Sequence, residues 1–378
     1  MRRFATRLAS FLIAGQRAHG SLVCVADMKH VTRCIETLPK DSCMHPWSTM
    51  RFFYALLLLC TLLAMVPSRL MAQKAVTIVI MPKLVGIPYY VSVKRDGVDK
   101  AAAELPDARV IWIGPSLPLV QRQIRLIEKI LPLQPDVIAV AANDAEKIQP
   151  ILKQAAHQGC HIMSWDADTS FREIFVNLVD YQKFGRNMVE TLVQQMGPRG
   201  HIAIVTTSFS APNQSRWIQA IRQTIASSYP DISIATVRPA GENTENAMRI
   251  TKGIIRDFPH IKGIIALGAP NLPGAAQALA TLHLEHAIAL TGNSTPNMMK
   301  PYVTRGIVKR FWAWDVPNHG YLSVYTAYNL ARGRIAAGKP FVAGKLGTFV
   351  PQKDAKGLFI IPGDPLAFDA ENINEAHF

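Results

Sequence analysis

Polar and aromatic side chains gather in this sequence at the points where its apolar runs end. They are Lys83 and Tyr89 after Val76–Met81, Trp165 and Asp166 at the end of His161–Trp165, Asn213 and Gln214 at the start of a helical pattern, and Asp315 after Val308–Trp312. The stretch Gly268-Ala269-Pro270-Asn271, with a polar Asn271, follows Ile261–Leu267. Carboxylate and amide oxygens accept hydrogen bonds from hydroxyl groups, an ammonium group donates them, and aromatic rings cover apolar C–H faces. Charged partners strengthen such hydrogen bonds. The mixture is typical of a site for a polyhydroxylated ligand such as a sugar.

Several of these side chains also fit a purely structural role. Lys83 fits a solvated loop, and Trp165 fits a place in the core, where most tryptophans are largely buried. Asp168, two residues after Asp166, is better explained as the cap or brace of a turn than as a ligand contact. The types of these residues therefore leave both interpretations open.

The sequence lacks the motifs of common catalytic and metal sites. It has no Gly-x-Ser-x-Gly elbow, no phosphate loop ending in Gly-Lys-Ser/Thr and no Gly-x-Gly-x-x-Gly after a strand. Asp166-x-Asp168 is not followed by carboxylates at calcium-loop spacing, and His283-x-x-His286 lacks the glutamate and the spacing of a zinc helix. Cys160 opens an apolar strand and fits packing better than nucleophilic attack. We therefore expect no enzyme, no cofactor and no metal site.

The elements that must position these side chains alternate between short apolar runs and longer amphipathic runs. Predicted strands are Val76–Met81, Val110–Ile113, Val137–Ala141, His161–Trp165, Ile174–Val179, His201–Val205, Ile232–Val237, Ile261–Leu267, Ala287–Leu290 and Val308–Trp312. Predicted helices lie near Val93–Leu105, Leu119–Leu131, Ala145–His157, Phe184–Met196, Gln214–Ser227, Thr244–Arg256 and Gly274–Leu282. Apolar strands separated by helices indicate parallel sheets covered on both faces. We predict an α/β fold of two doubly wound units, with ligands beyond the carboxyl ends of the strands.

The first 73 residues have the features of a leader followed by a secretory signal. Met50-Arg51 is followed by the mostly apolar run Phe52–Val66, a polar break, and the small residue Ala72 before Gln73-Lys74. The apolar run is shorter than the roughly 20 residues of a spanning helix. We predict a signal peptide at residues 50–73, with an uncleaved anchor as the alternative. Residues 1–49 fit no domain and indicate either a start site assigned too far upstream or a flexible leader.

The charge of the predicted mature chain argues against nucleic-acid binding. Residues 1–73 contain nine basic and three acidic residues, so their removal lowers the net charge from +14 to +8. The remaining charges are scattered, whereas a nucleic-acid-binding domain would show a basic stripe or motif. Cys160 is the single cysteine left, so an internal disulfide is excluded. About 300 residues suffice for two domains that each bury a core.

Four motifs occur in the order found in one known family. They are Pro82-Lys83-Leu84-Val85-Gly86, Ser164-Trp165-Asp166-Ala167-Asp168-Thr169, Ser294-Thr295-Pro296-Asn297 with Pro301-Tyr302-Val303, and Trp314-Asp315-Val316. From about Val76 to Phe378, the chain resembles the type I periplasmic sugar-binding proteins of ABC importers, and most closely the branch of the autoinducer-2 receptor and the rhamnose-binding proteins. The resemblance implies a monomer in the periplasm that closes two lobes around a small ligand. A permease in the inner membrane would recognise the closed form.

The resemblance also implies a set of ligand contacts. The autoinducer-2 receptor holds its ligand with a lysine, two aspartates, a glutamine and backbone near a proline and an alanine. By similarity, four of these groups correspond to Lys83, Asp166, Gln214 and Ala269. Asn213 stands in place of the second aspartate, which removes a charge and adds two donors, and Leu267 stands in place of the proline. These departures favour a deoxyhexose such as rhamnose. Autoinducer-2, or a sensory role beside a membrane kinase, is the alternative.

The chain of this family crosses between its lobes three times. By similarity we place the crossings near Phe175–Leu178, Trp314–Pro317 and Gly344–Thr348, with the helix around Tyr321–Arg332 returning to the first lobe. The resemblance therefore predicts residues 75–174 and 317–344 for lobe 1, and residues 177–313 and 346–378 for lobe 2.

Overall fold

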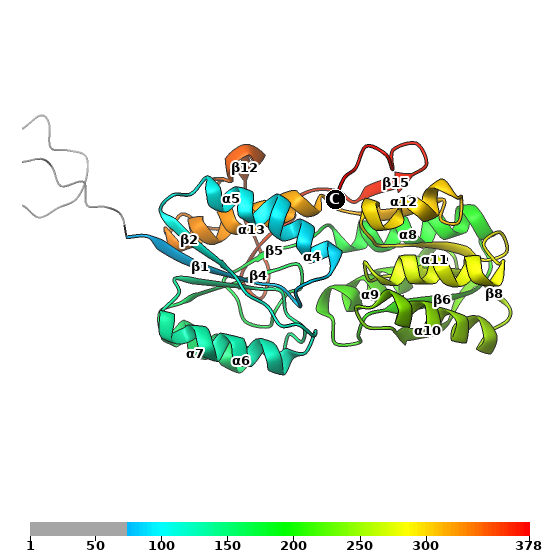
Figure 1. Cartoon of the computed structure of the whole chain (residues 1–378), viewed down its shortest axis with the longest axis horizontal. Helices are drawn as coiled ribbons and strands as arrows, with labels where there is room; N and C mark the ends of the chain where they lie inside the picture. Colours follow the sequence, from blue (N-terminus) through cyan, green and yellow to red (C-terminus); the bar gives the residue numbers. More distant parts are fainter. Residues whose placement is uncertain (1–73) are drawn as a thin grey trace, which may run out of the picture. The chain divides into compact units, whose positions relative to one another are not determined.

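The structure, a computed structural model, describes residues 74–378 of the chain (Figure 1). The predicted leader at residues 1–49 and the predicted signal peptide at residues 50–73 lie outside the described residues. Within residues 74–378, no helix has both the length and the apolar character needed to span a membrane. The described chain forms two α/β lobes, each built on its own parallel sheet.

Lobe 1 is built on a seven-stranded sheet with the strand order β13-β14-β5-β4-β3-β1-β2. Its strands are β1 (Val76–Met81), β2 (Ala108–Trp112), β3 (Val137–Val140), β4 (His161–Trp165), β5 (Ile174–Val176), β13 (Gln352–Lys353) and β14 (Leu358–Ile360). All neighbours pair in parallel except β13 and β14, which are antiparallel. The central strands β1 and β3 are almost wholly buried, as expected where helices cover both faces.

Helices cover both faces of this sheet (Figure 1). One face is covered by the continuous helical stretch α4 (Pro88–Ser92), η1 (Val93–Val98) and α5 (Asp99–Ala103), together with α13 (Val316–Ala331). The other face is covered by α6 (Val120–Ile130) and α7 (Gln149–His157), and the 3-10 turn η2 (Leu131–Leu133) follows α6. Alternate residues of β1 serve the two faces, because Ile78 packs with the first group and Val79 with the second.

The helical stretch α4–α5 and helix α13 approach one another backbone to backbone. A Cβ atom added at Gly320 of α13 would lie 2.7 Å from the carbonyl oxygen of Val93, and one added at Gly97 would lie 2.2 Å from that of Pro317. Real Cβ atoms do not come so close, so this contact requires glycine on both helices. The close fit places α4, and with it Tyr89 and Tyr90, beside the chain segment that joins the two lobes.

Lobe 2 is built on a four-stranded parallel sheet with the order β7-β6-β8-β9. Its strands are β6 (Gly200–Thr206), β7 (Ile232–Pro239), β8 (Ile261–Ala266) and β9 (Ala289–Gly292), extended by the antiparallel pair β10 (Arg310–Ala313) and β15 (Leu366–Asp369). Helices α8 (Tyr181–Met196) and α9 (Pro212–Ser228) pack on one face. Helices α10 (Thr244–Asp257), α11 (Asn271–Leu282) and α12 (Pro296–Thr304) share the core of the other face.

Local capping chemistry sets where several of these helices begin. The carboxylate of Asp180 accepts a hydrogen bond from the backbone N–H of Lys183 at 2.9 Å, and Asn243 caps α10 in the same way. Helix α9 begins with Pro212, whose missing N–H is no loss in the first turn. The helix predicted near Ala145–His157 begins only at Gln149, because the Asp144 carboxylate accepts from the N–H groups of residues 146 and 147 and holds a separate turn.

The chain passes between the lobes three times, and one predicted crossing is wrong. It leaves lobe 1 after β5, returns after β10 into α13, and leaves again after β14 towards β15. The third crossing was predicted at Gly344–Thr348, but that segment holds the 3-10 turn η3 (Gly344–Leu346) and the small hairpin of β11 (Phe341–Val342) and β12 (Thr348–Phe349). Strand β14 then pairs in parallel with β5. Residues 352–360 therefore belong to lobe 1, and the crossing lies after Ile360.

Candidate functional site

The carboxyl ends of the two sheets face a common cleft lined by both lobes. Its lining residues are Lys83, Ile87, Tyr89, Tyr90 and Asp166 from lobe 1, Asn213, Gln214, Trp217, Glu242, Leu267, Gly268, Ala269 and Asn293 from lobe 2, and Trp314 from the second crossing. The cavity among them is only about 30 Å³, and one ordered water needs about 10–15 Å³ of such space. A sugar therefore enters this cleft only when the lobes separate.

Lys83 stands at the carboxyl end of β1 and is only 4 % exposed. Its backbone carbonyl accepts a hydrogen bond from Asn143 Nδ2 at 2.9 Å, and Gln123 Nε2 donates to the neighbouring carbonyl of Pro82 at 3.2 Å. These bonds fix the loop, so the ammonium group points across the cleft. Lys83 Nζ donates to Asn213 Oδ1 of lobe 2 at 2.9 Å. Lys83 is thus a buried cation that joins the two lobes.

Asp166 follows β4 with a left-handed backbone, at φ 59°. Asp tolerates this region better than most residues, and unusual backbone conformations often mark functional sites. Its Oδ2 accepts from Tyr90 Oη at 2.5 Å, and its Oδ1 accepts from Asn213 Nδ2 at 3.2 Å. The carboxylate is therefore buried, oriented by lobe 1 and reached from lobe 2.

The first turn of α9 supplies the matching groups of lobe 2. Asn213 contacts Lys83 and Asp166 as described, and Gln214 Oε1 accepts from Thr206 Oγ1 at 2.5 Å and from the N–H of Thr207 at 2.8 Å. These two bonds orient the Gln214 amide. Its nitrogen makes no hydrogen bond within residues 74–378, so it can donate to a ligand.

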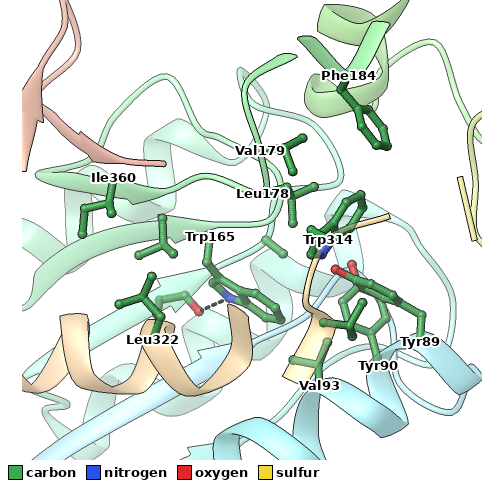
Figure 2. Close-up of a cluster of buried hydrophobic side chains, with 14 of the residues drawn as sticks. Tyr89, Tyr90, Val93, Trp165, Leu178, Val179, Phe184, Trp314, Leu322 and Ile360 are labelled. Carbon is green, nitrogen blue, oxygen red and sulfur yellow. Dashed lines mark hydrogen bonds between the residues drawn. The ribbon is translucent and has the colours of Figure 1, made fainter. Parts of the chain in front are cut away.

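Four aromatic rings form one wall of the cleft: Tyr89, Tyr90, Trp217 and Trp314. Figure 2 shows Trp314 between Phe184 of lobe 2 and the two tyrosines of lobe 1, and its ring centroid lies 6.0 Å from that of Tyr89 and 5.9 Å from that of Trp217. Tyr89 Oη, Trp217 Nε1 and Trp314 Nε1 are buried without a hydrogen-bond partner among the described residues. Buried donors are nearly always bonded, so these three groups can serve a ligand.

Burial keeps the phenol groups of this wall in their protonated form. It raises the pKa of Tyr89 and of Tyr90 well above the ordinary value, and the negative charge of Asp166 raises both further. Both hydroxyls therefore remain donors at every physiological pH. The cleft thus combines donors, acceptors and ring faces, the combination that binds a polyhydroxylated ring.

Six of the eight residues predicted for the site line this cleft: Lys83, Tyr89, Asp166, Asn213, Gln214 and Ala269. Trp165 does not, because its side chain lies in the core, where Nε1 donates to the carbonyl of Ala139 at 3.1 Å (Figure 2). Asp315 does not, because its carboxylate caps α13 by accepting from the N–H of Asn318 at 2.9 Å and lies beside a separate cavity. These two assignments are corrected.

Asp168 has the bracing role that was expected of it. Its Oδ1 accepts from Ser164 Oγ at 2.6 Å and from Arg172 Nε at 3.0 Å. Arg172 also pairs with Asp354 at 2.6 Å, so the brace ties the turn after β4 to the C-terminal strands of the same sheet. The ion pairs of Arg172 with Asp168 and Asp354 therefore stabilise the turn that carries Asp166.

Sequence reasoning missed several residues of the cleft, above all Glu242, Tyr90, Trp217 and Trp314. Glu242 follows β7 and could have been found by the strand-end rule, but it lies within a polar stretch that reads as an ordinary loop. Trp217 lies in the middle of an amphipathic helix, where a core role is the expected one. Within residues 74–378, no group of three or more His, Cys, Asp or Glu side chains could hold a metal ion.

The sequence between residues 78 and 335 matches the family model described as periplasmic binding protein domain. The chain belongs to this family. The solved structures that resemble this periplasmic binding protein include an ABC transporter solute-binding protein from Clostridium phytofermentas with bound L-rhamnose, at 25% sequence identity and a TM-score of 0.76, covering 80% of this chain and 98% of that one. Another is LsrB from Clostridium saccharobutylicum in complex with AI-2, at 23% identity and a TM-score of 0.75, covering 80% and 100%.

A third similar structure is a sugar ABC transporter from Actinomyces odontolyticus, at 27% identity and a TM-score of 0.64, covering 81% of this chain and 98% of that one. The resemblance seen in the sequence is confirmed by these matches, and the fold of this periplasmic binding protein is the type I arrangement of two α/β lobes.

Proposed function

We propose that this periplasmic binding protein captures a small sugar between its lobes and delivers it to an ABC importer. The observation that supports the proposal best is the composition of the cleft, in which a buried lysine, a buried aspartate and two amides face a wall of four aromatic rings. Hydroxyl groups of a sugar would bond with the first set, and its C–H face would lie on the second. The function is binding, and no catalytic role is proposed for any residue.

A deoxyhexose such as rhamnose is the favoured ligand. Ile87, Leu267 and Ala269 line the cleft beside the polar groups and offer an apolar contact for a methyl substituent. The relative from Clostridium phytofermentas, 25% identical, holds L-rhamnose. Asn213 also favours a deoxyhexose, because it supplies donors where the autoinducer-2 receptor has a second carboxylate.

Autoinducer-2 is the alternative ligand, and Lys83, Asp166 and Gln214 favour it. These three residues match the ligand-holding lysine, first aspartate and glutamine of that receptor, and all three line the cleft. A role in signalling would follow, either through uptake or by docking onto a membrane kinase. The same lobe closure would serve each role, so the ligand separates sugar import from autoinducer-2 uptake, and the docking partner separates import from sensing.

Ligand binding would favour the closed arrangement of the lobes. Lys83 and Asp166 belong to lobe 1, while Asn213 and Gln214 belong to lobe 2, so one ligand that bonds with all four links the lobes. An inner-membrane permease would recognise this closed form. The family implies a periplasmic location, and cleavage near Gln73 or Lys74 would release the protein there. An N-terminal mass spectrum of the exported protein tests the cleavage.

Thermal unfolding of the purified mature protein with a ligand panel tests the proposal. The panel contains rhamnose, other deoxyhexoses, pentoses, hexoses and autoinducer-2. A ligand at a hundred times its dissociation constant adds about 2.7 kcal/mol to the free energy of unfolding, which raises the melting temperature by several degrees. A rise with one sugar supports sugar transport, a rise with autoinducer-2 alone moves the function to signalling, and no rise with any member contradicts both.

A further inference from the structure

Glu242 is a second carboxyl group in the cleft, and it lies between two neighbouring cavities. It lines the main cavity together with Lys83 and Asp166, and it lines a smaller cavity at the seam of the lobes together with Asn143 and Ser210. Lys83 is the other residue shared by the two cavities. Ser210 Oγ of lobe 2 donates to the carbonyl of Asn143 of lobe 1 at 3.3 Å, so the lobes meet at this seam.

The backbone on both sides of Glu242 is held in place by hydrogen bonds. Gly241 turns the chain after β7 with φ 70°, a conformation that favours glycine. Its N–H donates to the carbonyl of Thr207 at 3.0 Å, and its carbonyl accepts from Asn271 Nδ2 at 2.9 Å. On the other side, Asn243 caps α10. The position from which the Glu242 side chain enters the cleft is therefore set by the fold.

The surroundings of the Glu242 carboxyl combine one cation with a second acid. Lys83 faces it from the loop after β1, Asp166 from the end of β4, Tyr89 and Tyr90 from α4, and Thr207 from the end of β6. Burial raises the pKa of Glu242; Lys83 and a hydrogen bond with Thr207 act against that shift, whereas Asp166 adds to it.

The single positive charge of Lys83 cannot neutralise the carboxylates of both Asp166 and Glu242. Its ammonium group donates to Asn213, and it supplies one positive charge against two carboxylates. A half-buried carboxylate that lacks full compensation is costly unless further donors reach it. Hydroxyl groups of a bound ligand are such donors, and an anionic ligand would instead add a third negative charge to the same small space.

We propose that Glu242 is a specificity-determining residue whose carboxylate accepts hydrogen bonds from ligand hydroxyl groups on the lobe 2 side of the cleft. The site then selects neutral sugars with free hydroxyls at that position and rejects sugar acids and sugar phosphates. This inference rests on the proposed function and specifies the substrate class of the same site. A site built to bond a hydroxyl discriminates strongly against an analogue that lacks it, because its own polar group is left unpaired.

The inference predicts a pH dependence with a defined sign. The ligand bonds to the ionised carboxyl group of Glu242. The affinity for the sugar is therefore at its maximum above the pKa of Glu242 in the free protein, and it falls as the pH drops through that value. Because this pKa is raised, the fall begins closer to neutral pH than for an ordinary glutamate. Tyr89 and Tyr90 keep their protons throughout this range. Asp166 is the other acid, and its contribution is measured separately with Asp166→Asn.

The experiment compares the mature wild-type protein with Glu242→Gln, Glu242→Asp and the control Glu245→Gln. Glu245 lies three residues further on, exposed in the first turn of α10. Dissociation constants are measured by calorimetry for the sugar that raises the wild-type melting temperature most. The pH is varied from about 4.5, near the ordinary pKa of glutamate, to about 8. The dissociation constant of the uronic acid with the same ring configuration as that sugar is measured under the same conditions.

Glu242→Gln is expected to weaken the neutral sugar about tenfold to a hundredfold at neutral pH, the loss of a hydrogen bond to a charged group. The affinity of this variant should depend less on pH, and the ratio of its affinities for the neutral sugar and for the uronic acid should be smaller than in the wild type. Its melting temperature without ligand should be unchanged or higher. Glu242→Asp should keep part of the affinity and the pH profile, and Glu245→Gln should behave as wild type. If the wild type binds sugar and Glu242→Gln binds it equally well with the same pH profile, the inference is overturned and the proposed function stands. If the wild type binds no sugar, both are overturned.

Discussion

Replacement of Asp166 separates the contribution of its charge from that of its backbone conformation. Asp166→Asn keeps the size of the side chain and tolerates the left-handed backbone at φ 59°. It removes the negative charge that would strengthen hydrogen bonds with ligand hydroxyls. Affinity for the sugar should therefore fall by about 1.5–3 kcal/mol, which is about tenfold to a hundred-and-fifty-fold in the dissociation constant.

The stability of the unliganded protein should respond differently to Asn and to Ala at this position. The Asn oxygen can still accept from Tyr90 Oη, which belongs to the same lobe. Ala leaves this buried hydroxyl without its acceptor, at a cost of about 1–3 kcal/mol, and it lacks the short polar side chain that lets Asp and Asn tolerate a left-handed backbone. Asp166→Ala should thus melt several degrees below Asp166→Asn, although both bind the ligand weakly.

Calorimetric titration and thermal unfolding of the three proteins measure these effects side by side. The titration reports the ligand contact, and the unfolding curve without ligand reports the structural role. Wild-type affinity in Asp166→Asn would refute a ligand role for the carboxylate. Equal melting temperatures of the Asn and Ala variants would refute the structural reasoning about Tyr90 and the backbone, whatever the affinities are.

Three further predictions concern the cleft, the close helix contact and the lone thiol. Gln214→Glu keeps the oxygen that accepts from Thr206 and Thr207 but replaces the free amide donor by an acceptor. The affinity for the sugar, measured by calorimetry, should therefore fall at least about tenfold. Unchanged affinity would mean that the amide nitrogen of Gln214 does not contact the ligand. Gly320→Ala places a Cβ 2.7 Å from the Val93 carbonyl oxygen and should cost about 1–3 kcal/mol in denaturant unfolding. The control Gly253→Ala lies inside α10, where its Cβ would make only an ordinary 3.6 Å contact with Arg238 Nη1, and it should gain about 0.5–1 kcal/mol. Burial raises the pKa of the Cys160 thiol to about 12, so a thiol reagent at about pH 8 should label it only after unfolding, and rapid labelling of the native protein would contradict its burial.

Most strands of both sheets were predictable because a parallel strand covered on both faces reads as a short continuous apolar run. β1 and β4 have the predicted bounds, and other strands differ by a few residues. Strands β13 and β14 were not predicted, because each has only two or three residues and β14 pairs with a strand that is distant in the sequence. The pairing of β14 with β5 is a tertiary contact without a local signal, which is why the third crossing was misplaced.

Position beside a strand end or a helix start placed most, but not all, of the predicted residues in the cleft. Lys83, Asp166, Asn213 and Gln214 were chosen because they follow a strand or begin a helix, and all four line the cleft. Trp165 and Asp315 were chosen by the same rule, but Trp165 is the last residue of β4 and faces the core, and Asp315 caps α13. Tyr90 and Trp314 are sequence neighbours of the predicted Tyr89 and Asp315, but the orientation of their rings depends on packing among the aromatic side chains, which no local pattern reveals.

The third crossing has a consequence for the order in which this protein can fold during export. Lobe 1 is assembled from three separate stretches of chain, and its contacts join residues as far apart as Arg172 with Leu358, 186 positions along the sequence, and Tyr328 with Asp107, 221 positions apart. Contacts at such separation form late, because the loop between them must be closed first. Lobe 1 therefore lacks α13, β14 and the edge strand β13 until nearly the whole polypeptide has emerged. If the protein is exported as proposed, its chain would remain incompletely folded while it is threaded across the membrane, and the cleft would assemble only on the far side.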